Sequence, residues 1–443
     1  MLRRVLLLLG LAFLVCAQTP PPLIALGDSL GEGVQSAIAS DRTQPHVYLN
    51  LIAQQMNVAF PLPLMSTTFY GVIGNVSGRA RENPSLVAAD MAVSGADTTS
   101  ILTAAAQAPA ADETDLVLEP QTGLTQITAA AAARAPFTIC WIGSNDVLGA
   151  VLAFDDLNAT QITPVATFQS NYDQITSSLG ATGSRIVYAN IPDVTQIAFL
   201  FSPEDLTLFL GSSYGLPEGS YTTVVAMLLI KLGLEDPSIL QNPDWVLDPT
   251  ELQTIETAVV TFNQIIAQEA AKINAPVVDV YDLFNQYTAN PPVIGGVTLT
   301  PRYLGGLFSL DGVHPSDIGH ALLANGFIAG IDAYYGTTVP QIGKGPLTAI
   351  LDADPFVDFK GALQVRGRPL NGLLETLGPF LGISGDYTNL PGASKRVTSP
   401  GINPAAGRLF MQQYFQAIGK DPNTPWTSQD PVSAMRYAFH LPN

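Results

Sequence analysis

The sequence LIALGDSL, at residues 23–30, places a short apolar run directly before a glycine and a serine. Four consecutive apolar residues bounded by a turn residue are typical of a buried strand. The glycine at position 27 permits a sharp turn, which would leave the hydroxyl of Ser29 at the edge of a sheet and open to a cleft. The alternative interpretation is that Ser29 only caps the start of a helix.

The same pattern recurs along the chain. Strands are predicted at residues 23–26, 90–93, 137–142, 185–190 and 277–280, and helices at residues 47–56, 123–133, 167–179, 249–273 and 317–335. Buried strands alternating with helices indicate a parallel sheet that is covered on both faces. We therefore predict a three-layer α/β/α sandwich with a five-stranded parallel sheet, which would bind its ligand at the carboxyl ends of the strands.

The alternating strands and helices predict one domain at residues 18–335. Two regions do not follow the alternation, one inside this domain and one after it. Residues 195–248 form an apolar insertion that contains Phe199, Phe201, Phe209 and the run at 224–230. Two interpretations stay open for this insertion, which is expected to be helical: extra packing on the sandwich, or a lid or wall of an acyl-chain pocket. Residues 336–443 are rich in glycine and proline and predict a C-terminal appendage of unknown role, with one helix near residues 405–418.

The first 17 residues are typical of a secretory signal peptide. Arg3 and Arg4 precede an eleven-residue apolar core at residues 5–15, and small residues stand where a signal peptidase would cut. This core is too short to cross a bilayer, so a secreted or periplasmic protein without a membrane span is expected. The alternative is a lipoprotein anchored through Cys16.

The composition excludes some partners. The chain has 37 acidic and 19 basic residues, a net charge of −18, which disfavours binding to nucleic acid. Apolar contact with a lipid interface is compatible with this charge. After signal removal Cys140 is the only cysteine, so an internal disulfide cannot form. The four histidines show no paired spacing with cysteines, and no metal or cofactor is predicted.

A base for Ser29 is suggested by the sequence Asp311-Gly312-Val313-His314, which precedes a predicted helix. An aspartate three residues before a histidine on one loop can accept a hydrogen bond from the imidazole and fix its tautomer. The alternative is that Asp311 caps the loop and His314 is merely buried.

Acyl transfer also needs hydrogen-bond donors for the oxyanion. Asn145 follows the predicted strand at 137–142, and Gly95 follows the one at 90–93, so both should reach the carboxyl edge of the sheet. Both sequences would equally suit ordinary turns after strands.

Taken together, these segments resemble the conserved blocks of the GDSL, or SGNH, hydrolase family, in the family's order and over about residues 22–340. Ser29 matches the serine of block I, Gly95 the glycine of block II, Asn145 the asparagine of block III, and Asp311 with His314 the pair of block V. The resemblance implies a flavodoxin-like fold and a carboxylic ester hydrolase without metal or cofactor. It also implies Ser29 as nucleophile, His314 as base, Asp311 as its partner, and an oxyanion hole formed by Ser29, Gly95 and Asn145.

The substrate of such an enzyme is expected to be a lipid or other acyl ester. Two alternatives are a carbohydrate acetyl-esterase and a non-catalytic extracellular binding protein on the same scaffold. The sequence departs from the family at Gly31-Glu32-Gly33, where relatives often carry a different polar run, and this puts the local turn in doubt.

Overall fold

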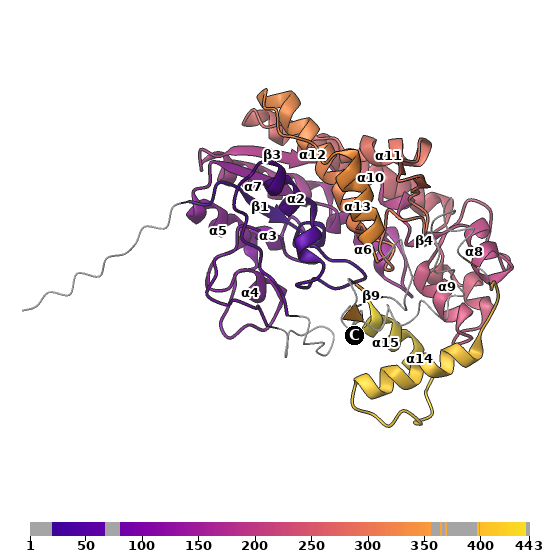
Figure 1. Ribbon diagram of the computed structural model, residues 1–443. Helices are drawn as coiled ribbons and strands as arrows, with labels where there is room; N and C mark the ends of the chain where they lie inside the picture. The colour runs from indigo at the N-terminus through magenta and orange to yellow at the C-terminus, as the bar shows by residue number, and fades with distance from the viewer. Residues whose placement is uncertain are drawn as a thin grey trace, which may run out of the picture.

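Four parallel strands form the central sheet of the computed structural model (Figure 1). The structure describes residues 20–66, 80–355, 364–365, 368–369, 397 and 399–439, so the predicted signal peptide and Cys16 lie outside the described residues. The strands lie side by side in the order β1 (Ile24–Gly27), β2 (Phe137–Trp141), β3 (Arg185–Ala189) and β6 (Val277–Val278). The predicted α/β fold with a parallel sheet is therefore confirmed.

The prediction of a fifth strand at residues 90–93 is wrong in detail. This segment runs beside β1, with a parallel bridge from Asp90 to Ala25 and a 3.1 Å hydrogen bond from the N–H of Val93 to the carbonyl of Gly27. A regular ladder would also need the N–H of Gly27, but that group donates to the side-chain Oε1 of Gln126 at 3.0 Å. The side chain of Gln126 therefore takes the place of one backbone hydrogen bond between the two segments. Residues 90–93 consequently form only an isolated bridge with β1.

The last predicted strand is also shorter than expected. Residues 277–280 were expected to be extended, but the strand ends at Val278 and the helix α11 (Val280–Ala289) begins two residues later. The side chain of Asp279 accepts a hydrogen bond from the N–H of Asp282 and so caps the new helix.

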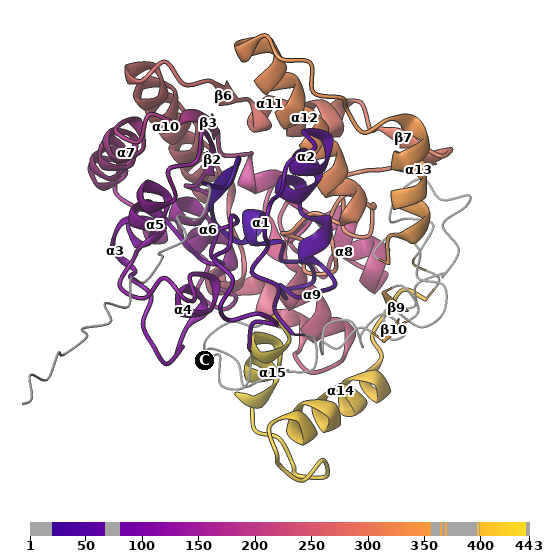
Figure 2. The same ribbon diagram turned by 60° about the vertical axis from the view of Figure 1, so that its left-hand side comes forward.

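Helices cover both faces of the sheet (Figure 2). On one face the ring of Trp141 meets Tyr48 of α2 (Tyr48–Gln55) at 5.5 Å and Phe327 of α12 (Asp317–Tyr335) at 5.6 Å. On the other face Tyr188 meets Tyr172 of α7 (Val165–Gly180) at 5.9 Å. The helices α5 (Gln126–Ala133) and α10 (Pro249–Lys272) pack beside α7.

These five helices correspond to the five predicted ones. The largest difference is at α5, which begins at Gln126 instead of residue 123 because Thr125 caps it by accepting from the N–H of Thr128. The remaining helices are α1 (Ser29–Glu32), α3 (Ser100–Thr103), α4 (Glu113–Val117), α6 (Asn145–Leu152), α8 (Pro203–Leu210), α9 (Val224–Lys231), α13 (Lys344–Ala353), α14 (Pro404–Ala417) and α15 (Asp430–Ala438).

Three small antiparallel pairs complete the strands. They are β4 (Leu200–Phe201) with β5 (Thr222–Thr223), β7 (Val293–Ile294) with β8 (Val297–Thr298), and β9 (Gln364–Val365) with β10 (Arg368–Pro369). Among the described residues, no helix is long and apolar enough to cross a membrane.

The insertion at residues 195–248 is part of the packed interior. Phe199, Phe201 and Phe209 are each no more than 1% exposed, and every residue of α9 is buried. These large side chains are therefore enclosed by the fold, while Ile197 of the same insertion lines a pocket beside Ser29.

The C-terminal segment covers this insertion. The helices α14, predicted near residues 405–418, and α15, which was not predicted, both pack against α9 (Figure 1). The ammonium group of Lys231 donates to the carbonyls of Phe209, Ser399 and Gly401 at 3.0–3.2 Å. Phe439 meets the ring of Phe199 edge-on at 6.1 Å. We call the insertion and residues 399–439 together the outer shell.

Candidate active site

The nucleophile candidate stands where the first strand turns into a helix. Ser29 is the first residue of α1, and Asp28 caps this helix by accepting from the N–H of Leu30 at 2.9 Å. The residue before the cap has to be glycine, because a Cβ on Gly27 would lie 2.5 Å from the carbonyl oxygen of Trp141 on β2. The close approach of two strands thus fixes the position of the serine.

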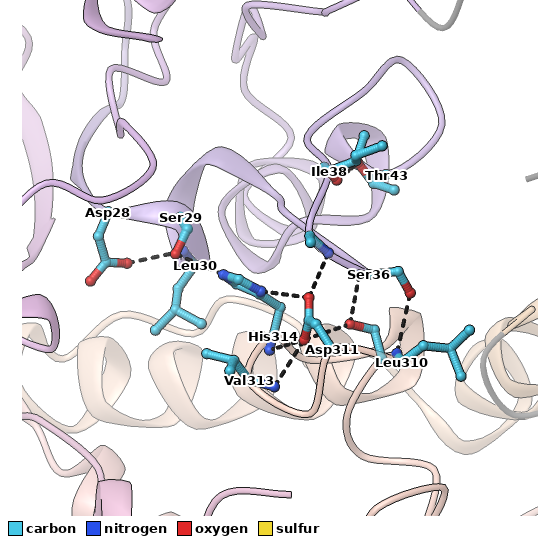
Figure 3. Close-up of polar contacts among 12 residues, drawn as sticks. Asp28, Ser29, Leu30, Ser36, Ile38, Thr43, Leu310, Asp311, Val313 and His314 are labelled. Atoms are coloured by element: carbon cyan, nitrogen blue, oxygen red, sulfur yellow. Dashed lines mark hydrogen bonds and ion pairs between the residues drawn. The ribbon is translucent and has the colours of Figure 1, made fainter. Parts of the chain in front are cut away.

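The structure brings the three predicted triad residues together (Figure 3). The Nε2 atom of His314 lies 2.8 Å from the hydroxyl of Ser29. The Nδ1 atom of the same ring lies 2.7 Å from Oδ2 of Asp311. These are hydrogen-bond distances from nucleophile to base and from base to orienting carboxylate.

Asp311 is held as an anion by its surroundings. Burial alone would raise its pKa, but the nearby His314 ring and the hydrogen bonds outweigh burial and hold the pKa below its usual value. The backbone N–H groups of Val313 and His314 donate to Oδ1 at 2.8 and 2.9 Å, and that of Ala37 donates to Oδ2 at 2.7 Å. A charged Asp311 can stabilise an imidazolium at His314.

The contribution of residues 36–37 was not predicted from the sequence. Ser36 and Ala37 both have left-handed φ angles, 50° and 69°, and this turns the N–H of Ala37 toward Asp311. The N–H of Ser36 donates to the hydroxyl of Ser309 at 2.8 Å. No motif marks such a conformation in non-glycine residues, so only the folded chain reveals it.

The loop of His314 also rests against the insertion. Gly312 has a φ of +74°, and a Cβ at this position would lie 2.7 Å from the backbone nitrogen of Phe199. The loop and the insertion are thus in backbone contact, which only glycine allows here.

Gly95 and Asn145 are connected through the turn at residues 93–96, because Asn145 donates a hydrogen bond to this turn. Gly95 belongs to a turn closed by the bond from the N–H of Ala96 to the carbonyl of Val93, at 3.0 Å. Its φ is +76°, and no atom lies within 4 Å of the position where a Cβ would be. Asn145, the first residue of α6, donates from Nδ2 to the carbonyl of Ala96 at 2.7 Å. Because a side-chain amide carries two hydrogens, one of them is left for another acceptor.

Two further acids and a histidine near the site serve the structure. Burial raises the pKa of Asp28 and of Asp146 to about 6. Asp146 accepts from the N–H and the hydroxyl of Thr98 at 2.9 and 2.7 Å. His320 is fully buried and accepts from the N–H of Tyr48 at 3.4 Å, and burial lowers its pKa to about 3, so it is neutral.

An apolar pocket that is partly open to solvent adjoins Ser29. One face of α11 lines it through Val280, Leu283, Phe284 and Tyr287. The other lining residues are Asp28, Leu30, Trp141, Ser144, Leu148, Pro192, Val194, Ile197, Leu307, Phe308, Val313, Pro315, Gly319 and Leu323. The helix α11 was not predicted from the sequence, and the strand predicted at residues 277–280 overlaps it only at Val280.

Within the described part of the chain, no three His, Cys, Asp or Glu residues are grouped as metal ligands. Cys140 is free and buried in β2, and burial raises its pKa to about 12. The thiol is therefore protonated at neutral pH and is an unreactive part of the core.

Several solved structures resemble the chain at low sequence identity. An α/β hydrolase from the metagenome of Lake Arreo, Spain, is 14% identical with a TM-score of 0.36, covering 70% of this chain and 94% of that one. The lipase/acylhydrolase from Enterococcus faecalis is 13% identical with a TM-score of 0.34, covering 72% and 98%. An acetylxylan esterase from Geobacillus stearothermophilus is 15% identical with a TM-score of 0.33, covering 70% and 94%.

A search of curated protein sequences found no match. The profile of the GDSL-like lipase/acylhydrolases, in contrast, matches residues 23–327, which is well over half of the chain and includes every residue of the candidate site. The protein therefore belongs to the GDSL-like lipase/acylhydrolase, or SGNH hydrolase, family and is an ester hydrolase.

Proposed function

We propose that the protein is a secreted serine hydrolase that cleaves carboxylic esters of lipids or other acyl groups through an acyl-enzyme on Ser29. The observation that carries this proposal is the continuous contact from Asp311 through His314 to Ser29, at 2.7 and 2.8 Å. Secretion rests on the sequence of residues 1–17, and the N-terminal residue of the mature protein tests it: Gln18 is expected.

In the first half of the reaction, Nε2 of His314 takes the proton of Ser29 while the serine oxygen attacks the ester carbonyl. Asp311 stabilises the imidazolium that results. The backbone N–H groups of Ser29 and Gly95 and the second amide hydrogen of Asn145 donate to the oxyanion. The tetrahedral intermediate then collapses, and the alcohol leaves with the proton from His314.

In the second half, water takes the place of the alcohol. His314 removes a proton from the water, the hydroxide attacks the acyl carbonyl, and the same donors hold the second oxyanion. The carboxylic acid departs and Ser29 recovers its proton from His314.

The apolar pocket supports an acyl chain as the group that binds beside Ser29. Leu283 and Phe284 of α11 face this pocket, and few polar groups line it. An aliphatic chain gains about 0.8 kcal/mol for each methylene that it buries on such a surface. A sugar would instead leave its hydroxyls without partners there.

The nucleophile is tested by labelling with a fluorophosphonate. The wild-type protein is expected to be labelled on Ser29, and Ser29→Ala to be neither labelled nor active. An unlabelled wild-type protein would support the non-catalytic binding protein. Faster turnover of acetylated xylan than of all nitrophenyl esters would support the carbohydrate acetyl-esterase.

The acyl pocket is tested by Leu283→Gln, with Ala289→Gln as control because Ala289 lies on the exposed part of the same helix. Placing an amide in the pocket should lower kcat/KM on a dodecanoyl ester about tenfold and leave an acetyl ester nearly unchanged. Ala289→Gln should change neither rate. An equal loss on both esters in Leu283→Gln would contradict an acyl pocket at this place.

A further inference from the structure

The acidic residue Glu32 has no part in the mechanism above, yet its side chain is completely buried beside the active-site turn. It lies at the end of α1, three residues after Ser29. Burying a carboxylate costs free energy unless hydrogen bonds compensate it. An apolar residue could be buried here at a lower cost in free energy. The reason for an acidic residue must therefore lie in the contacts that Glu32 makes.

Two of those contacts join Glu32 to one residue of the neighbouring turn. Oε2 of Glu32 accepts from the N–H of Ser94 at 2.6 Å and from the hydroxyl of Ser94 at 2.5 Å. Hydrogen bonds to an ionised acceptor are shorter and stronger than neutral ones. Ser94 directly precedes Gly95, so this pair of bonds fixes the chain at the residue next to the oxyanion donor.

The turn at residues 93–96 has three anchors. Val93 donates to the carbonyl of Gly27 at 3.1 Å, Ser94 donates to Glu32, and the carbonyl of Ala96 accepts from Asn145 at 2.7 Å. Gly95 has no side chain to hold it, and no atom lies within 4 Å of its Cβ position. Its orientation is therefore set by its neighbours in the chain.

We propose that Glu32 is a positioning residue, which holds the turn at residues 93–96 so that the N–H of Gly95 faces the oxyanion formed at Ser29. The inference rests on the proposed function, because it assumes an acyl transfer at Ser29. A donor that is misplaced by a small distance still allows substrate to bind but loses strength in the transition state. Glu32 thus joins the nucleophile helix to the oxyanion turn.

The test is Glu32→Gln, which keeps the size and one acceptor oxygen but removes the charge. We expect kcat on a butyrate ester to fall about tenfold while KM changes little, because the lost interaction is made in the transition state. A trifluoromethyl ketone, which forms an oxyanion adduct with the serine, should bind more weakly by the same factor. The affinity for the matching amide, which forms no adduct, should stay the same.

The matched control is Glu269→Gln, the same change at another fully buried glutamate. Glu269 pairs with Lys272 of α10 at 2.7 Å and has no contact with the turn. Glu269→Gln is expected to lower the melting temperature and to leave kcat and the affinity for the ketone unchanged. If Glu32→Gln behaves like this control, Glu32 is only structural and the inference is wrong.

A second variant covers the case in which Glu32→Gln does not fold. Ser94→Ala removes the hydroxyl donor and keeps the N–H, so it should lower kcat and ketone affinity together by a smaller factor of about three. No change in either quantity would overturn the inference. Failure of the wild-type protein itself to bind the ketone or the fluorophosphonate would instead disprove the acyl-enzyme on Ser29.

Discussion

The cleft around Ser29 and the outer shell are held together by different kinds of contact. In the cleft, Ser29 stands at the turn from β1 into α1, and His314 and Asp311 stand on the loop before α12. Short hydrogen bonds, 2.7 and 2.8 Å long, join the three residues. In the outer shell, apolar side chains fill the space between α9, α14 and α15, and the one buried ammonium group of Lys231 binds three carbonyls.

Because of this difference, substitutions in the two regions should affect different quantities, the catalytic rate in one and the free energy of unfolding in the other. Groups in the cleft act on the transition state, so their loss should change the rate and leave stability nearly intact. Groups in the outer shell exclude water from the core, so their loss should change stability and leave the rate per folded molecule intact. A single substitution that strongly lowers both the rate per folded molecule and the stability would contradict this division of roles.

The largest effect is expected for His314→Ala. Without a base, kcat/KM should fall by about four orders of magnitude or more, since triad members act as a unit. The melting temperature should stay near that of the wild type, because His314 is partly exposed in the loop. Measurements of ester hydrolysis and of thermal unfolding on the same variant check both expectations. A variant that is inactive because it is unfolded would contradict the prediction.

The second effect belongs to the outer shell. Phe439→Ala removes a ring that meets Phe154 and Phe199, and should lower the free energy of unfolding by about 3 kcal/mol. Leu409→Ala, on the exposed side of α14, is the control and should change it by about 0.5 kcal/mol at most. Urea unfolding measures both. A fall in kcat of the folded Phe439→Ala protein would show that the shell also supports catalysis.

Next is Asn145→Ala in the cleft. The variant loses an oxyanion donor, so kcat should fall about 100-fold while KM changes little. Steady-state kinetics on a short-chain ester decides this, and a change confined to KM would contradict the role of Asn145 as an oxyanion donor.

The smallest effect is the dependence of stability on pH through Asp28. Burial raises the pKa of Asp28 to about 6 from 3.8, so the folded protein binds this proton more tightly than the unfolded chain. Its contribution therefore favours the folded state below about pH 4 and is lost as the pH rises to about 6. Relative to Asp28→Asn, the wild type should lose about 2 kcal/mol between these values.

Unfolding by urea at several pH values measures this difference. Asp156→Asn, at an exposed position, is the control and should show no such change relative to the wild type. If the difference in free energy of unfolding between the wild type and Asp28→Asn is the same at every pH, burial does not raise the pKa of Asp28.

The motifs pointed to Ser29 and Asn145 because these residues stand just after β1 and β2, where local pattern and position in the fold coincide. Asp311 and His314 stand in a loop before α12, and the spacing of the two residues was the signal that pointed to them. The helices α2, α7 and α12 could be placed for the same reason, since their periodicity is local.

The rest depends on contacts between distant parts of the chain. Gln126 lies 99 residues from Gly27, and nothing near either residue indicates that the side chain replaces a rung of the sheet. The support of Asp311 by Ala37 spans 274 residues. The apolar insertion was open to two interpretations because hydrophobic composition predicts burial, but not whether the cover is protein or substrate.

The three hydrogen bonds of Lys231 have a mechanical consequence. An ammonium group has three N–H bonds, and all of them are used on the carbonyls of Phe209, Ser399 and Gly401. Separating the insertion from residues 399–439 would break the hydrogen bonds of Lys231 to Ser399 and Gly401. It would also break the ring contact between Phe439 and Phe199. The insertion, whose Ile197 lines the pocket beside Ser29, is thus tied to residues 399–401 through two of the three N–H bonds of one ammonium group.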